Sequence, residues 1–328
     1  MLINCVERDG LPINFFFFPT KKTYMAATIF VQIASYRDPQ LVPTVEDMCR
    51  QAEHPENLFF GIAWQHGPEE TLPETWFSHP NFSILDIPYT ESQGACWARN
   101  ALQQRYRGQT YTLQLDSHHR FVQGWDRKLI RWLQRLQRQG FPKPMLTTYL
   151  PAFDPDNDPA ARGKKPSGLA FDCFTPQGIL LLQPEKWREW RQLDNPVPAR
   201  FYSAHFCFTL GSFCIEVPHD PDLYFHGEEI SIAVRAYTHG YDLFHPHRVV
   251  AWHEYTRKNR VKHWEEKEDW RSKDTQSHRR VRALLGMGMG MDAVDISEGG
   301  LGTVRTLQEY ETYARLSFAQ RKVQSPWP

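Results

Sequence analysis

Apolar and polar positions alternate with strand and helix periods along the first half of the chain. The run 28–34, Thr-Ile-Phe-Val-Gln-Ile-Ala, is β-branched and uncharged, which is typical of a strand buried on both faces. A polar turn at 35–39 follows. Thr44, with two acids close behind it, predicts a helix start and a helix to about Ala52, because a hydroxyl and early carboxylates satisfy the free amides of a first turn.

The same order repeats further along the chain. We expect strands at 58–64, 82–87 and 110–115, and a helix at 95–106. Alternation of strands and helices is typical of an α/β protein in which helices cover both faces of a mainly parallel sheet.

The second half of the chain is less regular. Residues 124–139 carry apolar side chains at helical spacing, so we expect an amphipathic helix with Trp125 packed in the core. The proline-rich stretch 151–166 predicts a mobile surface loop of the kind that contacts ligands, and its basic run 162–165 is typical of a solvated surface. Further expected elements are strands near 169–174, 179–182, 205–215 and 249–253, a helix from Glu228 to a glycine cap at 240, a charged helical segment from 258 to 282, and a flexible hinge at 286–291.

Composition narrows the class of protein. The 328 residues are 41% hydrophobic, which is enough for a core, and 38 basic residues balance 38 acidic ones, which argues against general nucleic-acid binding. No run reaches the roughly 18 apolar residues of a membrane span. Six scattered cysteines without a CxxC pair favour reduced thiols and a cytoplasmic location. We interpret residues 1–25 as a loosely attached extension and 26–328 as the catalytic domain.

The main chemical signal is Asp116-Ser117-His118 at the end of an expected central strand. Ligands of open α/β sheets bind beyond the carboxyl ends of the strands. A carboxylate with an imidazole two residues later suits a divalent cation such as Mn²⁺ or Mg²⁺ whose other ligands are phosphate oxygens. In the alternative interpretation Asp116 caps a turn and His118 is solvated.

Ordered blocks around this triplet resemble one known family, the GlcNAc-transferase family (glycosyltransferase family 60). The resemblance extends from about residue 28 to 313, and its blocks are 30–39 (FVQIASYRDP), 60–65 (FGIAWQ), 94–99 (GACWAR), 113–118 (LQLDSH) with Trp125-Asp126, 225–231 (FHGEEIS), 237–242 (YTHGYD) and 300–307 (GLGTVRTL). Studied members attach N-acetylglucosamine to a hydroxyproline of a ubiquitin-ligase subunit.

This resemblance implies a GT-A fold, a UDP-GlcNAc donor, a divalent metal, retention of anomeric configuration and a hydroxyl acceptor on a protein or glycan. It also implies that His253 joins Asp116 and His118 as a metal ligand. His253-Glu254 does not start a zinc-protease motif, because Arg257 stands where the second histidine should be. The other histidines considered as ligands are His119, His245 and His247, each of which has an alternative as a surface or hydrogen-bonded residue.

Donor and acceptor residues follow from the same blocks. The expected nucleotide-sugar contacts are Tyr36, Arg37, Asp38, Arg99 and Ser117. Arg99 could instead be a salt-bridging surface residue, and Asp38 a plain turn residue. The expected catalytic residues are Asp116, Glu228 and Glu229. Because two acids at a helix start also favour the helix dipole, we expect one to serve there while the other, Glu229, faces the cleft.

Three functions remain open from the sequence. The first is a metal-dependent retaining glycosyltransferase that works by front-face transfer and gives an α-linked product. The second is a non-catalytic carbohydrate-binding protein, and the third is a metal-dependent hydrolase of nucleotide sugars. Acidic and imidazole side chains at strand ends favour an enzyme over a binding module, because a binder has no diphosphate to neutralise.

Overall fold

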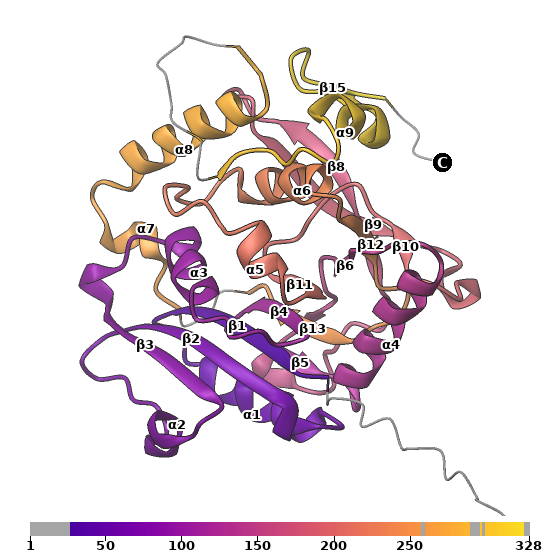
Figure 1. Ribbon diagram of the computed structural model, residues 1–328. Helices are drawn as coiled ribbons and strands as arrows, with labels where there is room; N and C mark the ends of the chain where they lie inside the picture. The colour runs from indigo at the N-terminus through magenta and orange to yellow at the C-terminus, as the bar shows by residue number, and fades with distance from the viewer. Residues whose placement is uncertain (1–26, 257–259, 289–295, 297–298, 325–328) are drawn as a thin grey trace, which may run out of the picture.

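A computed structural model describes residues 27–256, 260–288, 296 and 299–324. The expected extension 1–25, Arg257 and the end of the expected hinge, 289–291, lie outside these residues. An eight-stranded sheet in the order β10-β12-β6-β11-β4-β1-β2-β3 forms the centre of the molecule (Figure 1). Its strands mostly run in one direction, so the expectation of a mainly parallel α/β sheet is confirmed.

Strand–helix units build one half of the sheet. β1 pairs in parallel with β2 and β4, and β2 pairs in parallel with β3. β1 is buried over most of its length, as its uncharged β-branched sequence predicts. The elements of this half are β1 (Ile29–Tyr36), α1 (Leu41–Gln51), β2 (Leu58–His66), α2 (Glu74–Ser78), β3 (Phe82–Pro88), α3 (Ala95–Gln103) and β4 (Tyr111–Asp116).

One reversed strand joins the two halves of the sheet. β11 (Phe206–Leu210) runs antiparallel to β4 and to β6 (Pro144–Thr147), whereas β6 and β12 (Asp242–His245) are parallel. β10 (Val197–Pro198) closes this edge antiparallel to β12. Because β11 is reversed, the residues that precede it lie at the same edge of the sheet as the end of β4.

Three small sheets surround the central one. β5 (His119–Phe121) and β7 (Ala152–Phe153) flank β13 (Ala251–Glu254). The expected loop 151–166 therefore contributes a strand before it continues as turns. The other two pairs are β8 (Ser167–Phe174) with β9 (Leu180–Lys186), and β14 (Leu316–Ser317) with β15 (Lys322–Val323), and short 3-10 helices cover Pro55–Asn57, Tyr89–Glu91, Pro155–Asn157 and Trp190–Gln192.

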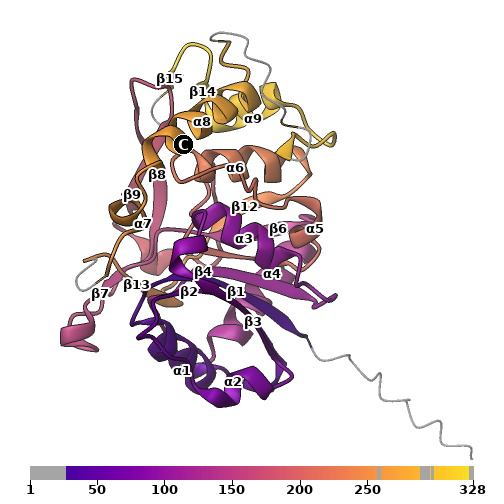
Figure 2. The ribbon, with the colours of Figure 1, turned by 90° about the vertical axis from the view of Figure 1, so that its left-hand side faces the viewer.

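Helices cover both faces of the central sheet. α1 and α4 (Trp125–Arg138) pack on one face in a shared core, and α3 and α6 (Glu228–Thr238) lie on the other (Figure 2). α8 and α9 lie on the outer side of α6 in both ribbon views. The remaining helices are α5 (Phe213–Glu216), α7 (His263–Glu266), α8 (Trp270–Leu284) and α9 (Leu307–Ala314).

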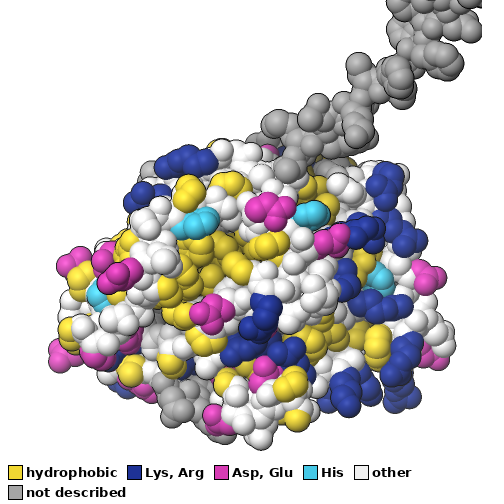
Figure 3. All heavy atoms as spheres, turned by 90° about the horizontal axis from the view of Figure 1, so that it is seen from below, with side chains coloured by type: hydrophobic (Ala, Val, Ile, Leu, Met, Phe, Trp, Pro, Cys, Tyr) yellow, Lys and Arg dark blue, Asp and Glu magenta, His cyan; other side chains and the backbone are white. Residues whose placement is uncertain are grey.

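The amphipathic pattern of α4 explains how it packs. Trp125, Leu129, Leu133 and Leu136 recur every three or four residues and are fully or almost fully buried. The opposite face is exposed and basic, and Lys and Arg side chains gather on this side of the molecule (Figure 3). The exposed basic residues of α4 are Arg127, Lys128, Arg131, Arg135 and Arg138. No helix in the described part of the chain is long and apolar enough to cross a bilayer.

Two glycines start the helices that point at the functional edge. Gly94 precedes α3 with φ +114° and Gly227 precedes α6 with φ +95°. A side chain at Gly227 would place its Cβ 2.5 Å from Val281 Cγ2 of α8, and one at Gly94 would come within 3.3 Å of the Tyr224 carbonyl oxygen. Both positions need glycine for its backbone conformation and for the close approach of a neighbouring element.

The expected helix start at Thr44 is wrong. α1 begins at Leu41, where the Asp38 carboxylate accepts a hydrogen bond from the Gln40 amide at 2.8 Å. Thr44 lies inside the helix, and its hydroxyl instead contacts the chain between β4 and β5. It lies 2.9 Å from the Ser117 carbonyl oxygen and 2.9 Å from the His119 amide. The same polar side chain therefore serves a tertiary contact that its sequence neighbours do not reveal.

The expected strand at 205–215 is also wrong in its second half. β11 ends at Leu210, and α5 follows after a turn. A Cβ at Gly211 would lie 2.0 Å from the Gln109 carbonyl oxygen, so the chain turns where its backbone meets another segment. After Gly211, Phe213 and Cys214 are buried in a helical turn, whereas Ile215 is exposed.

Candidate functional site

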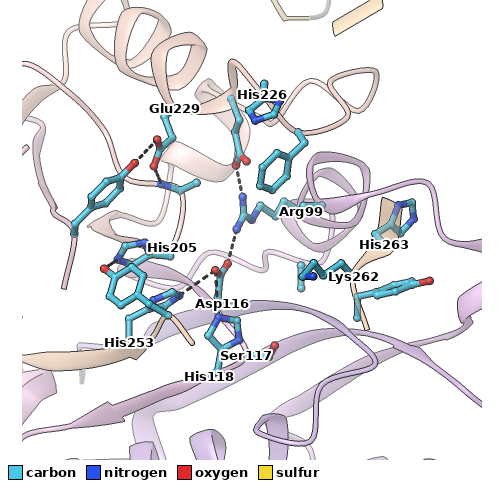
Figure 4. Close-up of a pocket in the computed structure, with 18 of the residues that line it drawn as sticks. Arg99, Asp116, Ser117, His118, His205, His226, Glu229, His253, Lys262 and His263 are labelled. Atoms are coloured by element: carbon cyan, nitrogen blue, oxygen red, sulfur yellow. Dashed lines mark hydrogen bonds and ion pairs between the residues drawn. The ribbon is translucent and has the colours of Figure 1, made fainter. Parts of the chain in front are cut away.

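A cavity of about 560 Å³ opens at the edge of the sheet where β1 and β4 end (Figure 4). This is the edge at which open α/β sheets bind ligands. Side chains reach it from strand ends, from the starts of α3 and α6, and from the segment around α7. Its polar lining includes Tyr36, Asp38, Arg99, Asp116, Ser117, His118, Tyr149, His205, His226, Glu228, Glu229, His253, Tyr255, Arg260, Lys262 and His263.

Asp116, His118 and His253 converge at this edge. Each offers one ligand atom, and these atoms lie within 4.8 Å of one another. Asp116 Oδ2 is 3.3 Å from His253 Nε2 and 3.7 Å from His118 Nε2. The pairing of β13 with β5 places His253 opposite His119, directly after β4. The structure thus brings together Asp116 and His118, which the sequence pattern pairs, and His253, which the family resemblance adds.

Asp38 orients His118 from behind. Its Oδ2 atom lies 2.6 Å from His118 Nδ1 and accepts a hydrogen bond from the Ser117 hydroxyl at 2.7 Å. Burial alone would raise the pKa of Asp38, but its contacts with His118 lower it below the ordinary value. Asp38 thus holds the Nδ1 side of the His118 ring, and Nε2 is the nitrogen on the side of Asp116.

Arg99 is a buried bridge between two acids. Its Nη2 donates to Asp116 Oδ1 at 2.7 Å, and its Nη1 contacts Glu228 Oε1. Burial alone would raise the pKa of Asp116, but the hydrogen bond with His253 and the charge of Arg99 lower it well below its ordinary value. Arg99 lines the cavity, yet its charge is already shared between two carboxylates, so it is neither a surface residue nor a free cation.

Burial lowers the pKa of two imidazoles beside Asp116, those of His253 and His205. Burial lowers the pKa of His253 well below 6.5 and that of His205 to about 3. The two rings stack, with centroids 4.1 Å apart, and His205 Nε2 accepts the Leu150 amide at 3.1 Å. Within the described residues, His253 Nδ1 is buried without a hydrogen-bond partner. Neutral imidazoles are the form in which histidine binds metal ions.

The adjacent acids Glu228 and Glu229 have different surroundings. Glu228 is buried against Arg99 and lies 3.0 Å from His219 Nε2; burial opposes its ionisation, but the Arg99 charge outweighs that and lowers its pKa. Glu229 accepts the Tyr149 hydroxyl at 2.6 Å and the Ala204 amide at 3.0 Å, and burial raises its pKa to about 7. Both line the cavity, and Glu228 is the one already held by a cation.

Arg260 and Tyr36 line the side of the cavity between the end of β1 and α7. Arg260 Nη2 contacts Glu254 Oε2 at 2.6 Å, and its Nη1 lies 2.6 Å from His118 Nδ1 and 2.9 Å from His118 Nε2. Arg37 pairs with Glu266 at 2.5 Å and does not line the cavity, whereas Tyr36 does. Of the five expected donor residues, the structure therefore places Arg37 behind the wall and the other four on it.

Several cavity residues were missed by sequence reasoning. His205 and Tyr149 flank β11 and β6, and Arg260 follows a charged run, so none lies in a recognisable motif. The reversed direction of β11 is what brings His205 to this edge, and no local pattern predicts it. Of the other histidines considered, His119, His245 and His247 are all buried; the Nδ1 atoms of the first two contact backbone carbonyl oxygens of Asp116 and Thr147.

Comparison with known proteins adds to this geometry. The family described as Glycosyltransferase (GlcNAc) matches residues 28–76 and 69–320 of the chain. No curated protein matches.

Among solved structures, GalNAc-T7 with UDP, GalNAc and Mn²⁺ is similar at 14% identity and a TM-score of 0.56, over 90% of this chain and 55% of that one. The chain thus spans about half the length of that protein. TarS from S. aureus in complex with UDP-GlcNAc is similar at 12% identity and a TM-score of 0.45, over 75% of this chain and 64% of that one. The likeness to GalNAc-T7 shows the GT-A fold that the sequence predicts.

Proposed function

Because the chain belongs to the GlcNAc glycosyltransferase family, and is therefore a glycosyltransferase, we propose that it moves N-acetylglucosamine from UDP-GlcNAc to a hydroxyl group. We further propose that the reaction needs Mn²⁺ or Mg²⁺ and retains the anomeric configuration. The observation that carries the proposal is the convergence of Asp116, His118 and His253 in the cavity at the end of β4. The acceptor hydroxyl would belong to a protein or a glycan.

The residues present fit a divalent cation. One carboxylate and two imidazoles can supply three ligand atoms, and His118 already has the carboxylate partner on its second nitrogen that metal-binding histidines usually have. A cation bound here would neutralise charge on the leaving diphosphate. Arg99 holds Asp116 Oδ1 and so leaves Oδ2, the atom that faces both histidines, for the cation.

Donor binding would use the wall between β1 and α7. We propose that Tyr36 and Ser117 contact the nucleotide, because both line the cavity beside Asp116. Asp38 would act by orienting His118, and Arg37 by holding Glu266, which also accepts the Tyr36 hydroxyl at 2.5 Å. Arg260 would exchange its contact with His118 for the donor phosphates, since its guanidinium lies 2.9 Å from His118 Nε2, the ring nitrogen on the side of the proposed cation.

Front-face transfer agrees with the surroundings of the two acids. A glycosyl-enzyme intermediate needs an ionised carboxylate free to attack the anomeric carbon. Glu228 is held by Arg99 and His219, and Glu229 accepts two hydrogen bonds and has a raised pKa. We therefore propose that Glu229 orients the sugar or acceptor, that the departing phosphate accepts the proton of the incoming hydroxyl, and that the product is α-linked.

The test is release of UDP from UDP-GlcNAc with Mn²⁺, with and without added acceptors, by the wild type and by Asp116→Asn. We expect Asp116→Asn to lose roughly 10²–10³-fold in rate, as in the loss of one electrostatic contact to developing charge. Asp86→Asn is the matched control, because Asp86 pairs with His66 at 2.7 Å at the end of neighbouring β3 but is largely exposed.

Three other results would contradict the proposal or favour one of the alternative functions. Full activity of Asp116→Asn at saturating Mn²⁺ would contradict the metal assignment. UDP release that no acceptor accelerates would identify a hydrolase, and donor binding without turnover would identify a carbohydrate-binding protein.

A further inference from the structure

A second group of one carboxylate and two imidazoles lies at the rim of the cavity. His226 precedes α6, and Asp274 and His278 lie on α8. Each offers one ligand atom, and these atoms lie within 4.8 Å of one another. We call this group the rim cluster. The side chain of His226 is 49% exposed, whereas those of Asp274 and His278 are 16% and 13% exposed, so the group is open to solvent on one side.

Helix geometry explains why the rim cluster forms. Asp274 and His278 are four residues apart on α8, and side chains at this spacing project from the same face of a helix. The segment that carries His226 is held against this face, because the Tyr224 amide donates to the Ser277 hydroxyl at 2.6 Å and Gly227 packs on Val281. His226 is therefore fixed opposite the two side chains of α8.

The separations in the rim cluster match those of ligands around one small cation. His226 Nδ1 lies 3.3 Å from Asp274 Oδ1, and His278 Nε2 lies 3.5 Å from Asp274 Oδ2. Charge-assisted hydrogen bonds are shorter, at about 2.7–2.9 Å. Ligands at about 2.0–2.1 Å from a tetrahedral zinc ion are about 3.3–3.4 Å from one another. Each imidazole lies near a different oxygen of the Asp274 carboxylate, and one ligand atom from each of the three residues lies within 4.8 Å of the other two, which leaves room for a shared ion.

We propose that the rim cluster binds a transition-metal cation of the zinc class, with His226, Asp274 and His278 as three ligands and water as the fourth. Two imidazoles with one carboxylate favour Zn²⁺ over Mn²⁺ or Mg²⁺ when no phosphate supplies oxygen ligands. The metal would tie α8 to the segment that leads into α6. That segment continues directly into Glu228, which holds Arg99, so the rim metal would stabilise the wall of the donor cavity from outside.

The experiment measures metal binding and not turnover. The full chain is freed of metal by chelation and dialysis, then titrated with Zn²⁺ by calorimetry and with Co²⁺ by visible absorption, in which tetrahedral Co²⁺ absorbs far more strongly than octahedral Co²⁺. Both are repeated for His278→Gln, and again in an Asp116→Asn background that removes the carboxylate ligand of the proposed metal site inside the cavity. His54→Gln is the matched control, because His54 Nδ1 lies 3.2 Å from an exposed acid, Glu56, on another face.

We expect one Zn²⁺ per chain to remain in the Asp116→Asn background and to bind at least 10-fold more weakly when His278→Gln is added. The control should bind as the parent does. Hydrogen exchange of residues 270–284 should slow on addition of Zn²⁺ in the parent, and His278→Gln should remove that effect. Equal Zn²⁺ affinity with and without His278, or no tetrahedral Co²⁺ band, would show that the rim cluster is only a set of ion pairs.

Discussion

The molecule contains two groups of one aspartate and two histidines. The first, which we call the cavity group, is Asp116, His118 and His253, and the second is the rim cluster. The cavity group is built from strand ends far apart in the sequence, and its carboxylate is shared with Arg99. The rim cluster takes two of its ligands from one helix and is open to solvent. A carboxylate that already neutralises a guanidinium has less charge to offer a cation. If both groups bind metal as proposed, the same three ligand types give a site that depends on the nucleotide sugar in the cavity and one that does not at the rim.

A histidine-to-glutamine substitution in each group should give the largest difference in transfer rate. We expect His253→Gln to lower the transfer rate roughly 10²–10³-fold, because it removes a proposed ligand of the ion that neutralises the leaving diphosphate. His278→Gln should change the rate by less than a few-fold, since α8 meets the cavity only at its rim, at His226 and Gly227, and not at the cavity group. UDP release at saturating Mn²⁺ measures both. Equal losses for the two variants would remove the distinction between the groups.

Glu229, beside the acid that holds Arg99, should affect the transfer rate without affecting metal binding by either group. We expect Glu229→Gln to lower transfer about 10²-fold through lost positioning of sugar or acceptor. Steady-state kinetics should show this, with Mn²⁺ affinity unchanged because Glu229 contacts Tyr149 and the Ala204 amide and not the cavity group. A sugar covalently attached to Glu228 or Glu229, detected by mass spectrometry, or a β-linked product would contradict front-face transfer.

The cavity group and the rim cluster should also differ in how UDP changes their affinity for metal ions. We expect UDP to raise the Mn²⁺ affinity of the chain at least 10-fold, because phosphate oxygens complete the cavity group and offset the Arg99 charge. The Zn²⁺ affinity of the rim cluster, measured in the Asp116→Asn background, should not change with UDP. Calorimetry in the presence and absence of UDP checks both. Tight Mn²⁺ binding by the cavity group without UDP would show that the carboxylate shared with Arg99 suffices.

The smallest expected effect is on stability. The pKa of Glu229 is raised to about 7 in the folded chain, so its folded state binds a proton more tightly than the unfolded state does. Its contribution to stability is present below about pH 4.5 and is lost as pH rises through 7. The pKa of Glu228 is lowered, so its contribution is present above pH 4.5 and is lost on acidification. Urea unfolding at pH 5 and pH 8 should show a smaller loss of stability with rising pH for Glu229→Gln than for the wild type.

Sequence reasoning reached those parts of the site that lie close together along the chain. Asp116 and His118 are two residues apart after a strongly apolar strand, so their shared location was predictable. His253 came only from the family resemblance, because it reaches Asp116 through the pairing of β13 with β5. Thr44 was misread, since its hydroxyl serves a contact 73 residues away.

The rest of the site depends on chain direction and on charge pairing across the fold. That Arg99 binds nucleotide stays a prediction, and the two acids that it bridges could not be predicted because they lie 17 and 129 residues away in the sequence. The rim cluster could not be predicted from the sequence for a similar reason. Asp274 and His278 belong to a charged helix whose side chains are typical of a solvated surface, and nothing local places His226 opposite them.

The reversed strand β11 also fixes the position of His205 relative to Asp116. Its register with β4, in which Phe206 lies opposite Leu115, fixes how far the preceding residue extends over Asp116. Because neighbouring side chains on an extended chain point to opposite sides, a slip of one residue would exchange His205 for a neighbour and turn the imidazole away from His253. The spacing between His205 and β11 is therefore under a strict constraint, and an insertion between His205 and Phe206 should be tolerated far less well than one between β8 and β9.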